Sequence, residues 1–132
     1  MLRYLLDTNL CIRVLRERPA SLRDRFNREA DGLCISTIVL TELLHDAAKS
    51  ARPDHNRREV ESFAARLEVL AFDSDAAGHA ADIRAALERD GLGIGGYDVL
   101  IAGQARSRGL VVVTSNLAEF RLVAGLRCED WS

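Results

Sequence analysis

The chain of 132 residues is 48% hydrophobic and 29% charged, with 9 Gly and 2 Pro, which is typical of one globular domain and excludes disordered or repetitive classes. We therefore expect a single domain over residues 1–132. The net charge of −2 gives no reason by itself to expect nucleic acid as a partner.

Cys11, Cys34 and Cys128 lie far apart, which argues against a disulfide framework or a zinc finger and favours a reducing cytoplasm. No uncharged apolar stretch approaches the roughly 18 residues of a membrane span, and the N-terminal apolar run soon meets Asp7, so we expect neither a membrane helix nor a signal peptide.

Short apolar segments alternate with amphipathic ones along the chain, a pattern that predicts strands alternating with helices. We expect strands at residues 2–6, 33–36, 68–73, 110–113 and 126–128. We expect helices at about 10–17, from Pro19 to about 30, from Ser36 or Thr37 to 48, around 60–67, from Ser74 or Asp75 to about 89, at 97–108, and around 117–120. Because the strands are uniformly apolar, they predict a parallel sheet covered on both faces, in a three-layered α/β fold.

Polar residues follow several of the predicted strands, at the edge where ligands bind in open parallel sheets. They come after three strands, on the helices that follow, and at the opening of the helix after the glycine-rich segment: Asp7, Thr8, Asn9, Ser36, Thr37, Glu42, Asp98, Thr114, Ser115, Asn116 and Glu119. Since the carboxyl ends of parallel strands meet at one edge, we expect several acidic side chains to face one crevice.

Clustered carboxylates repel one another, which raises their pKa values and destabilises the fold unless a cation neutralises them. Histidine and thiolate ligands are absent from these positions, so the oxygen-rich cluster favours Mg²⁺ or Mn²⁺ over Zn²⁺. Such ions commonly serve phosphoryl chemistry, because they lower the pKa of a bound water and stabilise charge on the reacting oxygens. A bound cation would also explain how an acidic pocket accepts a phosphodiester.

Each candidate also has a purely structural interpretation. Asp7 can be a helix cap, Glu42 a solvated surface residue, and Asp98 a charge that complements the helix dipole. The segment 91–96 holds four glycines, but it lacks the pattern of a nucleotide-binding P-loop. The three histidines, which show no metal-ligand spacing, are expected at the surface: His45, His55 and His79.

Four segments in order resemble the motif blocks of PIN domains. Leu5 to Asn9 resembles their LDTN opening, and Ile35 to Leu43 resembles the second block, with its glutamate at Glu42. Ile94 to Ala102 and Val113 to Phe120 resemble the third and fourth blocks. Order, spacing and length agree over essentially the whole chain, and the ending Leu126 to Trp131 fits as well. The sequence most resembles the VapC branch, the metal-dependent ribonuclease toxins of toxin–antitoxin pairs.

This resemblance implies a five-stranded parallel sheet flanked by helices and a pocket for one or two Mg²⁺ or Mn²⁺ ions. It implies Asp7, Glu42 and Asp98 as the ligand carboxylates, with Thr8 and Ser115 as supporting hydroxyls. VapC relatives cut RNA, several of them transfer RNA in the anticodon region, to inhibit translation. They form dimers, and a VapB antitoxin silences them by placing its C-terminal arm in the pocket.

Two positions depart from the family pattern. Asn116 stands where the fourth block usually has aspartate, so either its amide oxygen acts as a neutral ligand or Glu119 supplies the missing charge. We expect Asn116 to act with the three carboxylates. Asp46 replaces a residue that is usually small and lies one helical turn from Glu42, where it either adds a carboxylate near the pocket or faces water. We expect the second.

Two other functions are compatible with parts of the pattern. The first is a PIN fold without nuclease activity that binds antitoxin or RNA, against which the retained trio of carboxylates argues. The second is a response-regulator receiver domain, which needs a lysine at a strand end. The only lysine, Lys49, instead follows the helix after the second predicted strand.

Overall fold

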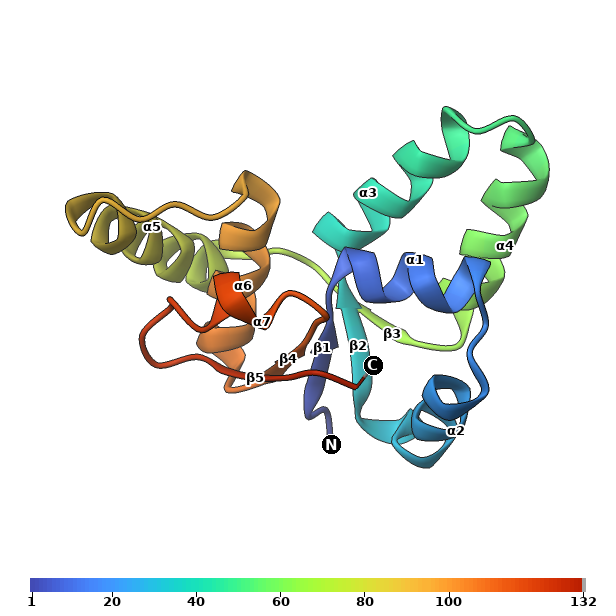
Figure 1. The fold of residues 1–132 in the computed structure, drawn as a ribbon, viewed down its shortest axis with the longest axis horizontal. Helices are drawn as coiled ribbons and strands as arrows, with labels where there is room; N and C mark the ends of the chain where they lie inside the picture. The colour runs from blue at the N-terminus through green and yellow to red at the C-terminus, as the bar shows by residue number, and fades with distance from the viewer. Residues whose placement is uncertain (132) are drawn as a thin grey trace.

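The computed structural model describes residues 1–131, whose centre is a five-stranded sheet (Figure 1). The strands are β1 (Tyr4–Leu6), β2 (Leu33–Ser36), β3 (Glu68–Leu70), β4 (Val111–Val113) and β5 (Arg127–Glu129). They are all parallel and lie in the order β3-β2-β1-β4-β5. The predicted fold class is therefore confirmed, and β1 occupies the middle of the sheet.

Helices cover the sheet from both sides, as a parallel sheet requires. They are α1 (Thr8–Arg16), α2 (Ala20–Arg28), α3 (Thr37–Ala48), α4 (Pro53–Ala65), α5 (Ser74–Arg89), α6 (Gly96–Arg108) and α7 (Leu117–Phe120). A 3₁₀ turn at Ala30–Gly32 precedes β2. In Figure 1, α5 and α6 lie on one side of the strands, and α1 to α4 lie on the other.

The third strand is shorter than the prediction of 68–73. It ends at Leu70 because the backbone N–H of Phe72 and the side chain of Asp73 make other hydrogen bonds. The N–H of Phe72 donates to Thr37 Oγ1 at 3.2 Å, and the Asp73 side chain accepts from Ala76 N at 2.9 Å. Asp73 therefore caps α5.

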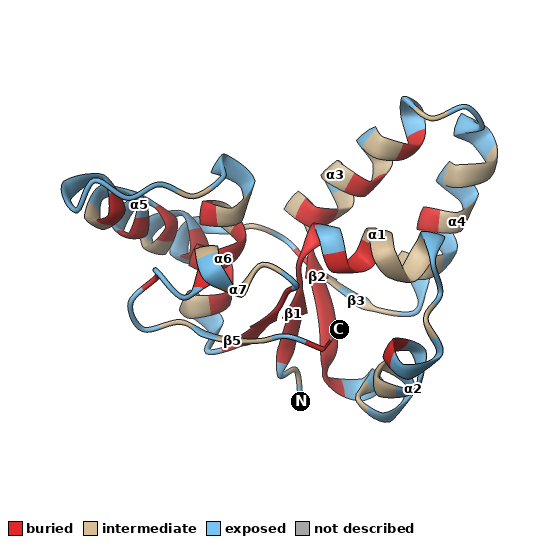
Figure 2. Cartoon of the chain, in the orientation of Figure 1, coloured by how far each residue is buried: buried red, intermediate tan, exposed pale blue. Residues whose placement is uncertain are grey.

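The three central strands are buried along their whole length, as Figure 2 shows. Leu5, Leu6, Ile35, Val112 and Val113 have no measurable exposure. Burial on both faces explains why these strands read as uninterrupted apolar runs. The edge strands β3 and β5 keep exposed or half-buried residues.

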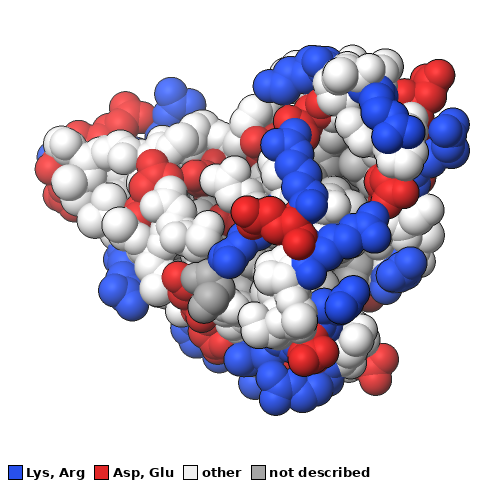
Figure 3. Space-filling view, turned by 45° about the vertical axis from the view of Figure 1, so that its right-hand side comes forward, with Lys and Arg blue, Asp and Glu red and all other residues white. Residues whose placement is uncertain are grey.

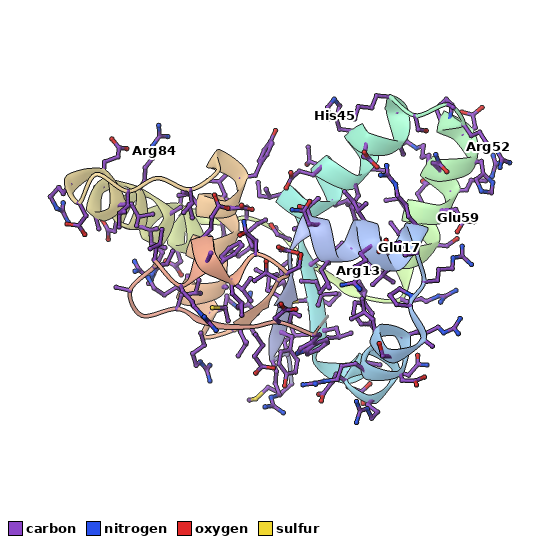
Figure 4. The ribbon with its side chains drawn as sticks, viewed as in Figure 1. Arg13, Glu17, His45, Arg52, Glu59 and Arg84 are labelled. Atoms are coloured by element: carbon purple, nitrogen blue, oxygen red, sulfur yellow. The ribbon has the colours of Figure 1, made fainter. Side chains whose placement is uncertain are left out.

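The surface mixes both signs of charge, and Figure 3 shows basic side chains across the face of α1, α2 and α4 with acidic ones between them. Many are paired along one helix, as Arg13 and Glu17 are on α1 at 3.1 Å (Figure 4). Such exposed pairs contribute little to stability. No helix within residues 1–131 combines the length and apolar character needed to cross a membrane.

The histidines are less uniformly exposed than expected. His45 is exposed near the end of α3, away from the strands (Figure 4). His55 and His79 are only partly exposed, although 43% of the His55 side chain is accessible, so they lie at the surface less fully than predicted. For His79 the reason is Arg106, whose Nε donates to His79 Nδ1 at 2.9 Å and whose Nη1 donates to the Ala124 carbonyl at 2.9 Å. Arg106, which lies on α6, therefore links α6 to α5 and to the loop after α7.

Helices α5 and α6 approach each other closely at Gly103. A Cβ atom built on this glycine would lie 2.6 Å from the Ala80 backbone nitrogen and 2.7 Å from its Cα and Cβ. No side chain fits there unless the helices separate. The small residues at both positions therefore set the spacing of this helix pair.

We expect Gly103→Ala to lower the free energy of unfolding by about 1–3 kcal/mol, because the added methyl group overpacks a backbone contact. Gly78→Ala is the matched control, since a Cβ at Gly78 of α5 meets no atom within 4 Å. Removing this helical glycine should stabilise the protein by up to about 1 kcal/mol. Urea unfolding of both variants measures the difference, and equal effects would show that the contact does not set the helix spacing.

Candidate functional site

Asp7 follows the central strand and is 2% exposed. Its Oδ1 accepts from the N–H of Leu10 at 2.9 Å, and its Oδ2 accepts from the hydroxyl of Thr114 at 2.5 Å. The sheet register explains the second contact: Leu6 pairs with Val113, so the residues that follow them lie side by side. Asp7 is thus both the cap of α1 and a buried carboxylate at the sheet edge.

Glu42 lies on α3 and contacts the start of α1. The Thr8 hydroxyl donates to Glu42 Oε1 at 2.5 Å. Glu42 is half-buried, so it is not a freely solvated glutamate. Thr8, which is 8% exposed, therefore fixes this side chain beside the end of β1.

Asp98 is half-buried in the first turn of α6 and shares a hydrogen bond with Glu119 of α7. Burial is the largest cause that raises the pKa of Asp98 to about 7, followed by that hydrogen bond and the negative charge of Glu119. The charges of Asp7 and Glu42 raise the pKa of Asp98 further. These four acidic side chains therefore act on one another, although they come from four different parts of the chain.

The Asp7 carboxyl group shows the same repulsion. Burial raises the pKa of Asp7, while the hydrogen bonds from Thr114 and Leu10 lower it. The charges of Glu42 and Asp130 raise it again, and the net change is upward. The carboxyl groups of Asp7 and Asp98 therefore keep their protons to a higher pH than ordinary carboxyl groups do.

Asn116 and Thr114 complete the polar network. Asn116 Nδ2 donates to Glu119 Oε2 at 2.6 Å, and the Asn116 N–H donates to Thr114 Oγ1 at 2.8 Å. The sequence placed Thr114 among the polar residues at the strand ends, and the family resemblance implied Thr8 and Ser115 as the supporting hydroxyls; Ser115 is exposed. The hydroxyl that contacts Asp7 belongs to Thr114, as the pairing of β1 with β4 would have indicated.

Asp46 does not join these carboxylates. Its Oδ2 lies 2.5 Å from Arg16 Nη2 of α1, and 28% of its side chain is exposed. Asp46 was expected either to add a carboxylate near the pocket or to face water. Neither describes it fully, because its carboxylate is partly exposed but paired with Arg16. Asn9, at the start of α1, is exposed.

The similarity of the chain to known proteins is extensive. The PIN-domain family model matches residues 4–126. A tRNA(fMet)-specific endonuclease VapC from Shigella flexneri is 49% identical over 132 residues, with all of both chains covered. A tRNA(fMet)-specific endonuclease VapC from Salmonella typhimurium is 51% identical over 131 residues, 99% of each chain. The chain belongs to the PIN-domain family, in its VapC branch of endoribonuclease toxins.

Solved VapBC structures resemble this PIN domain along its whole length. A crystal structure of DNA-bound VapBC from Salmonella typhimurium has a chain with a TM-score of 0.98 and 51% identity, with all of both chains covered. VapBC2 from Rickettsia felis, bound to a promoter DNA fragment, gives a TM-score of 0.95 at 32% identity, covering 99% of this chain and 100% of the other. The fold predicted from the motif blocks is therefore confirmed at the level of the family.

PIN-domain nucleases are generally metal-dependent, and the donor atoms at this site are all oxygen, which suits a hard divalent cation. Within residues 1–131, no three Asp, Glu, His or Cys side chains converge closely enough to hold an ion as they are arranged. Asp7 and Glu42 are instead engaged by the hydroxyls of Thr114 and Thr8, and Asp98 by Glu119. The chemistry of the donor set fits the cation. Burial is the main cause of the raised pKa values of Asp7 and Asp98, and a cation would offset both this burial and the smaller repulsion between the carboxylates.

In metal-free buffer we expect the free energy of unfolding to fall as pH rises from about 4 to 7. The folded protein keeps a proton on Asp98 up to pH about 7, whereas the unfolded chain loses it near 3.8. The raised pKa of Asp7 acts in the same direction. Urea titrations at several pH values should therefore give a shallower decline for Asp98→Asn than for the wild type.

The control for this comparison is Asp82→Asn, at an exposed position of α5, which should keep the wild-type slope. If the free energy of unfolding of Asp98→Asn falls with pH as steeply as that of the wild type, Asp98 does not keep a proton in the folded protein above its ordinary pKa.

Proposed function

We propose that the chain is a Mg²⁺- or Mn²⁺-dependent endoribonuclease toxin that hydrolyses RNA phosphodiester bonds at this acidic edge and so inhibits translation. In this proposal Asp7, Glu42 and Asp98 hold the cation. The observation that carries it is the convergence of these carboxylates with Glu119 at one edge of the sheet, where burial first and then the neighbouring negative charges raise the pKa of Asp98 to about 7. A cation bound between these carboxylates would stabilise the protein. It would also offset their negative charge, so that a phosphate group of the RNA can approach them.

The proposed substrate is transfer RNA, cut in the anticodon region. Two relatives that share about half of their residues with this chain over its full length are tRNA(fMet)-specific endonucleases, which makes initiator transfer RNA the first candidate. The basic side chains over α1, α2 and α4 (Figure 3) offer charges for the phosphates of an RNA that extends beyond the acidic pocket.

The roles of the individual residues follow from their contacts. When bound, the cation would lower the pKa of a water molecule and stabilise charge on the attacking and leaving oxygens. Leu10 N–H and the Thr114 hydroxyl fix both oxygens of Asp7, and Thr8 fixes Glu42. Asp98 must release its proton before it binds a cation, so metal affinity should increase as pH rises through about 7.

We also propose that residues 1–132 form one PIN domain that acts in the cytoplasm as a homodimer under the control of a VapB-type antitoxin. The support is the solved VapBC complexes, whose similar chains span the whole length of this one. A groove of about 430 Å³ between α1, α2 and α4 offers a docking place, since it combines apolar and basic side chains. They include Phe26, Phe63, Leu67, Arg18, Arg23 and Arg66.

We expect Asp7→Asn and Asp98→Asn each to lower RNA cleavage by orders of magnitude, because each removes the negative charge of a proposed cation ligand while keeping the side-chain shape. The assay follows cleavage of transfer RNA by purified protein with Mg²⁺, Mn²⁺ or chelator. A second readout is independent of activity: Mn²⁺ should raise the unfolding temperature of the wild type and raise it less in either variant.

Asp46→Asn is the matched control, since its carboxylate pairs with Arg16 and not with the other carboxylates. It should retain cleavage and the Mn²⁺ effect. Full metal-dependent cleavage by purified Asp7→Asn would place the activity at another site and refute the mechanism.

For the fourth position we propose Glu119 rather than Asn116 as the residue that supplies charge. Glu119 shares a hydrogen bond with Asp98, whereas Asn116 reaches this pair only through its amide donation to Glu119. Glu119→Gln should therefore weaken Mn²⁺ binding, measured by calorimetry, more than Asn116→Ala does. The reverse ranking would assign the ligand role to Asn116, as the sequence alone suggested.

A further inference from the structure

Tyr97 is the one exposed aromatic side chain among the large apolar residues of the described chain. It is 52% exposed, and the other exposed large apolar residues within 1–131 are Met1, Leu92 and Leu122. The remaining rings are buried or half-buried, and several pack on one another: Tyr4 and Phe26 contact Trp131, and Phe26 contacts Phe63. The Tyr97 ring is therefore the exposed aromatic surface of the described chain that a flat partner can contact.

The position of Tyr97 in α6 places it next to the acidic side chains of the site. It directly precedes Asp98 in the first turn of the helix. Gln104 lies seven residues later and so on the same helical face, and its Nε2 donates to the carbonyls of Leu70 and Ala71 at 3.3 and 3.2 Å. These carbonyls lie at the carboxyl end of β3. Tyr97 therefore lies on the face of α6 that turns toward the end of β3, while Asp98 contacts Glu119 of α7, which follows β4.

The backbone next to the ring carries no side chains. Gly95 and Gly96 precede Tyr97, and a Cβ on Gly96 would meet no atom within 4 Å. A Cβ on Gly95 would meet only the Asp98 carboxyl group, with Oδ2 at 3.5 Å. The glycines thus leave the backbone that precedes Tyr97 and Asp98 uncovered, and a flat group can approach it closely.

We propose that Tyr97 stacks on an unpaired nucleobase of the RNA substrate and so holds the adjoining phosphate at the carboxylates. This inference rests on the proposed ribonuclease function. Aromatic rings recognise splayed single-stranded bases by stacking, and a base next to the cleaved phosphodiester bond in an RNA loop is unpaired and free to stack. The ring supplies the contact and the hydroxyl is not needed, so phenylalanine should serve as well as tyrosine.

Steady-state cleavage of a transfer RNA by the full chain tests the role of the ring. Tyr97→Ala should raise KM about tenfold, the loss expected for one base–aromatic stack, with a smaller change in kcat. Tyr97→Phe should stay within about twofold of wild type. Leu92→Ala is the matched control, because Leu92 is 42% exposed in the same glycine-rich segment but carries no ring, and its KM should not change.

Stacking itself is measured with a single-stranded RNA that carries 2-aminopurine, whose fluorescence is quenched on an aromatic ring. Asp98→Asn protein binds without cleaving and should quench the probe, whereas Asp98→Asn with Tyr97→Ala should not. Equal quenching by both proteins, or an unchanged KM in Tyr97→Ala, would overturn the inference. So would a Tyr97→Ala protein whose oligomeric state changes by light scattering while its KM does not, because the ring would then be a contact between copies.

The two proposals fail in different ways. If the wild type cleaves no RNA but quenching depends on Tyr97, the ribonuclease proposal fails and the stacking contact stands. If cleavage depends on Asp98 but neither KM nor quenching depends on Tyr97, the stacking inference alone fails.

Discussion

A carboxyl group buried at the end of the central strand needs hydrogen-bond donors, and the geometry of the site follows from how Asp7 obtains them. One donor is the N–H of Leu10 in the first turn of α1, and the other is the Thr114 hydroxyl. The first is available only because the strand turns directly into a helix, and the second only because β4 pairs with β1 in this register. Both oxygens of Asp7 are therefore fixed by the fold itself, which gives a rigid reference point for the other acidic side chains.

The remaining carboxylates reach that point from separate helices, at a cost in electrostatic repulsion. Glu42, Asp98 and Glu119 come from α3, α6 and α7, and the raised pKa of Asp98 measures how strongly the cluster resists full ionisation. A protein under selection for stability alone would place positive charge there or neutralise the cluster. Retaining it makes sense where a cation is bound in function, and this is the usual exchange of stability for activity.

The sequence was sufficient to predict the strands, the class of the fold and most of the acidic site, for physical reasons. Burial on both faces makes β1, β2 and β4 largely apolar. The polar residues Asp7 and Ser36, at the ends of β1 and β2, cap the helices that follow. The pairings between distant parts of the chain were harder to predict. Thr114 contacts Asp7 across 107 positions, and this contact depends on the strand order, which hydrophobic periodicity does not reveal. The Arg16–Asp46 pair likewise depends on how α1 packs against α3.

The asparagine at position 116 makes sense when the charges of its neighbours are counted. Its Nδ2 donates to Glu119 Oε2 at 2.6 Å, so an aspartate there would replace a donor by a second anion against the same oxygen. Glu119 already raises the pKa of Asp98, and another negative charge would add to that repulsion. Asn116 itself carries no charge, so the negative charge of this segment lies on Glu119. The amide at Asn116 then has a different task, which is to hold Glu119 toward Asp98, and the two residues have to be considered as one unit.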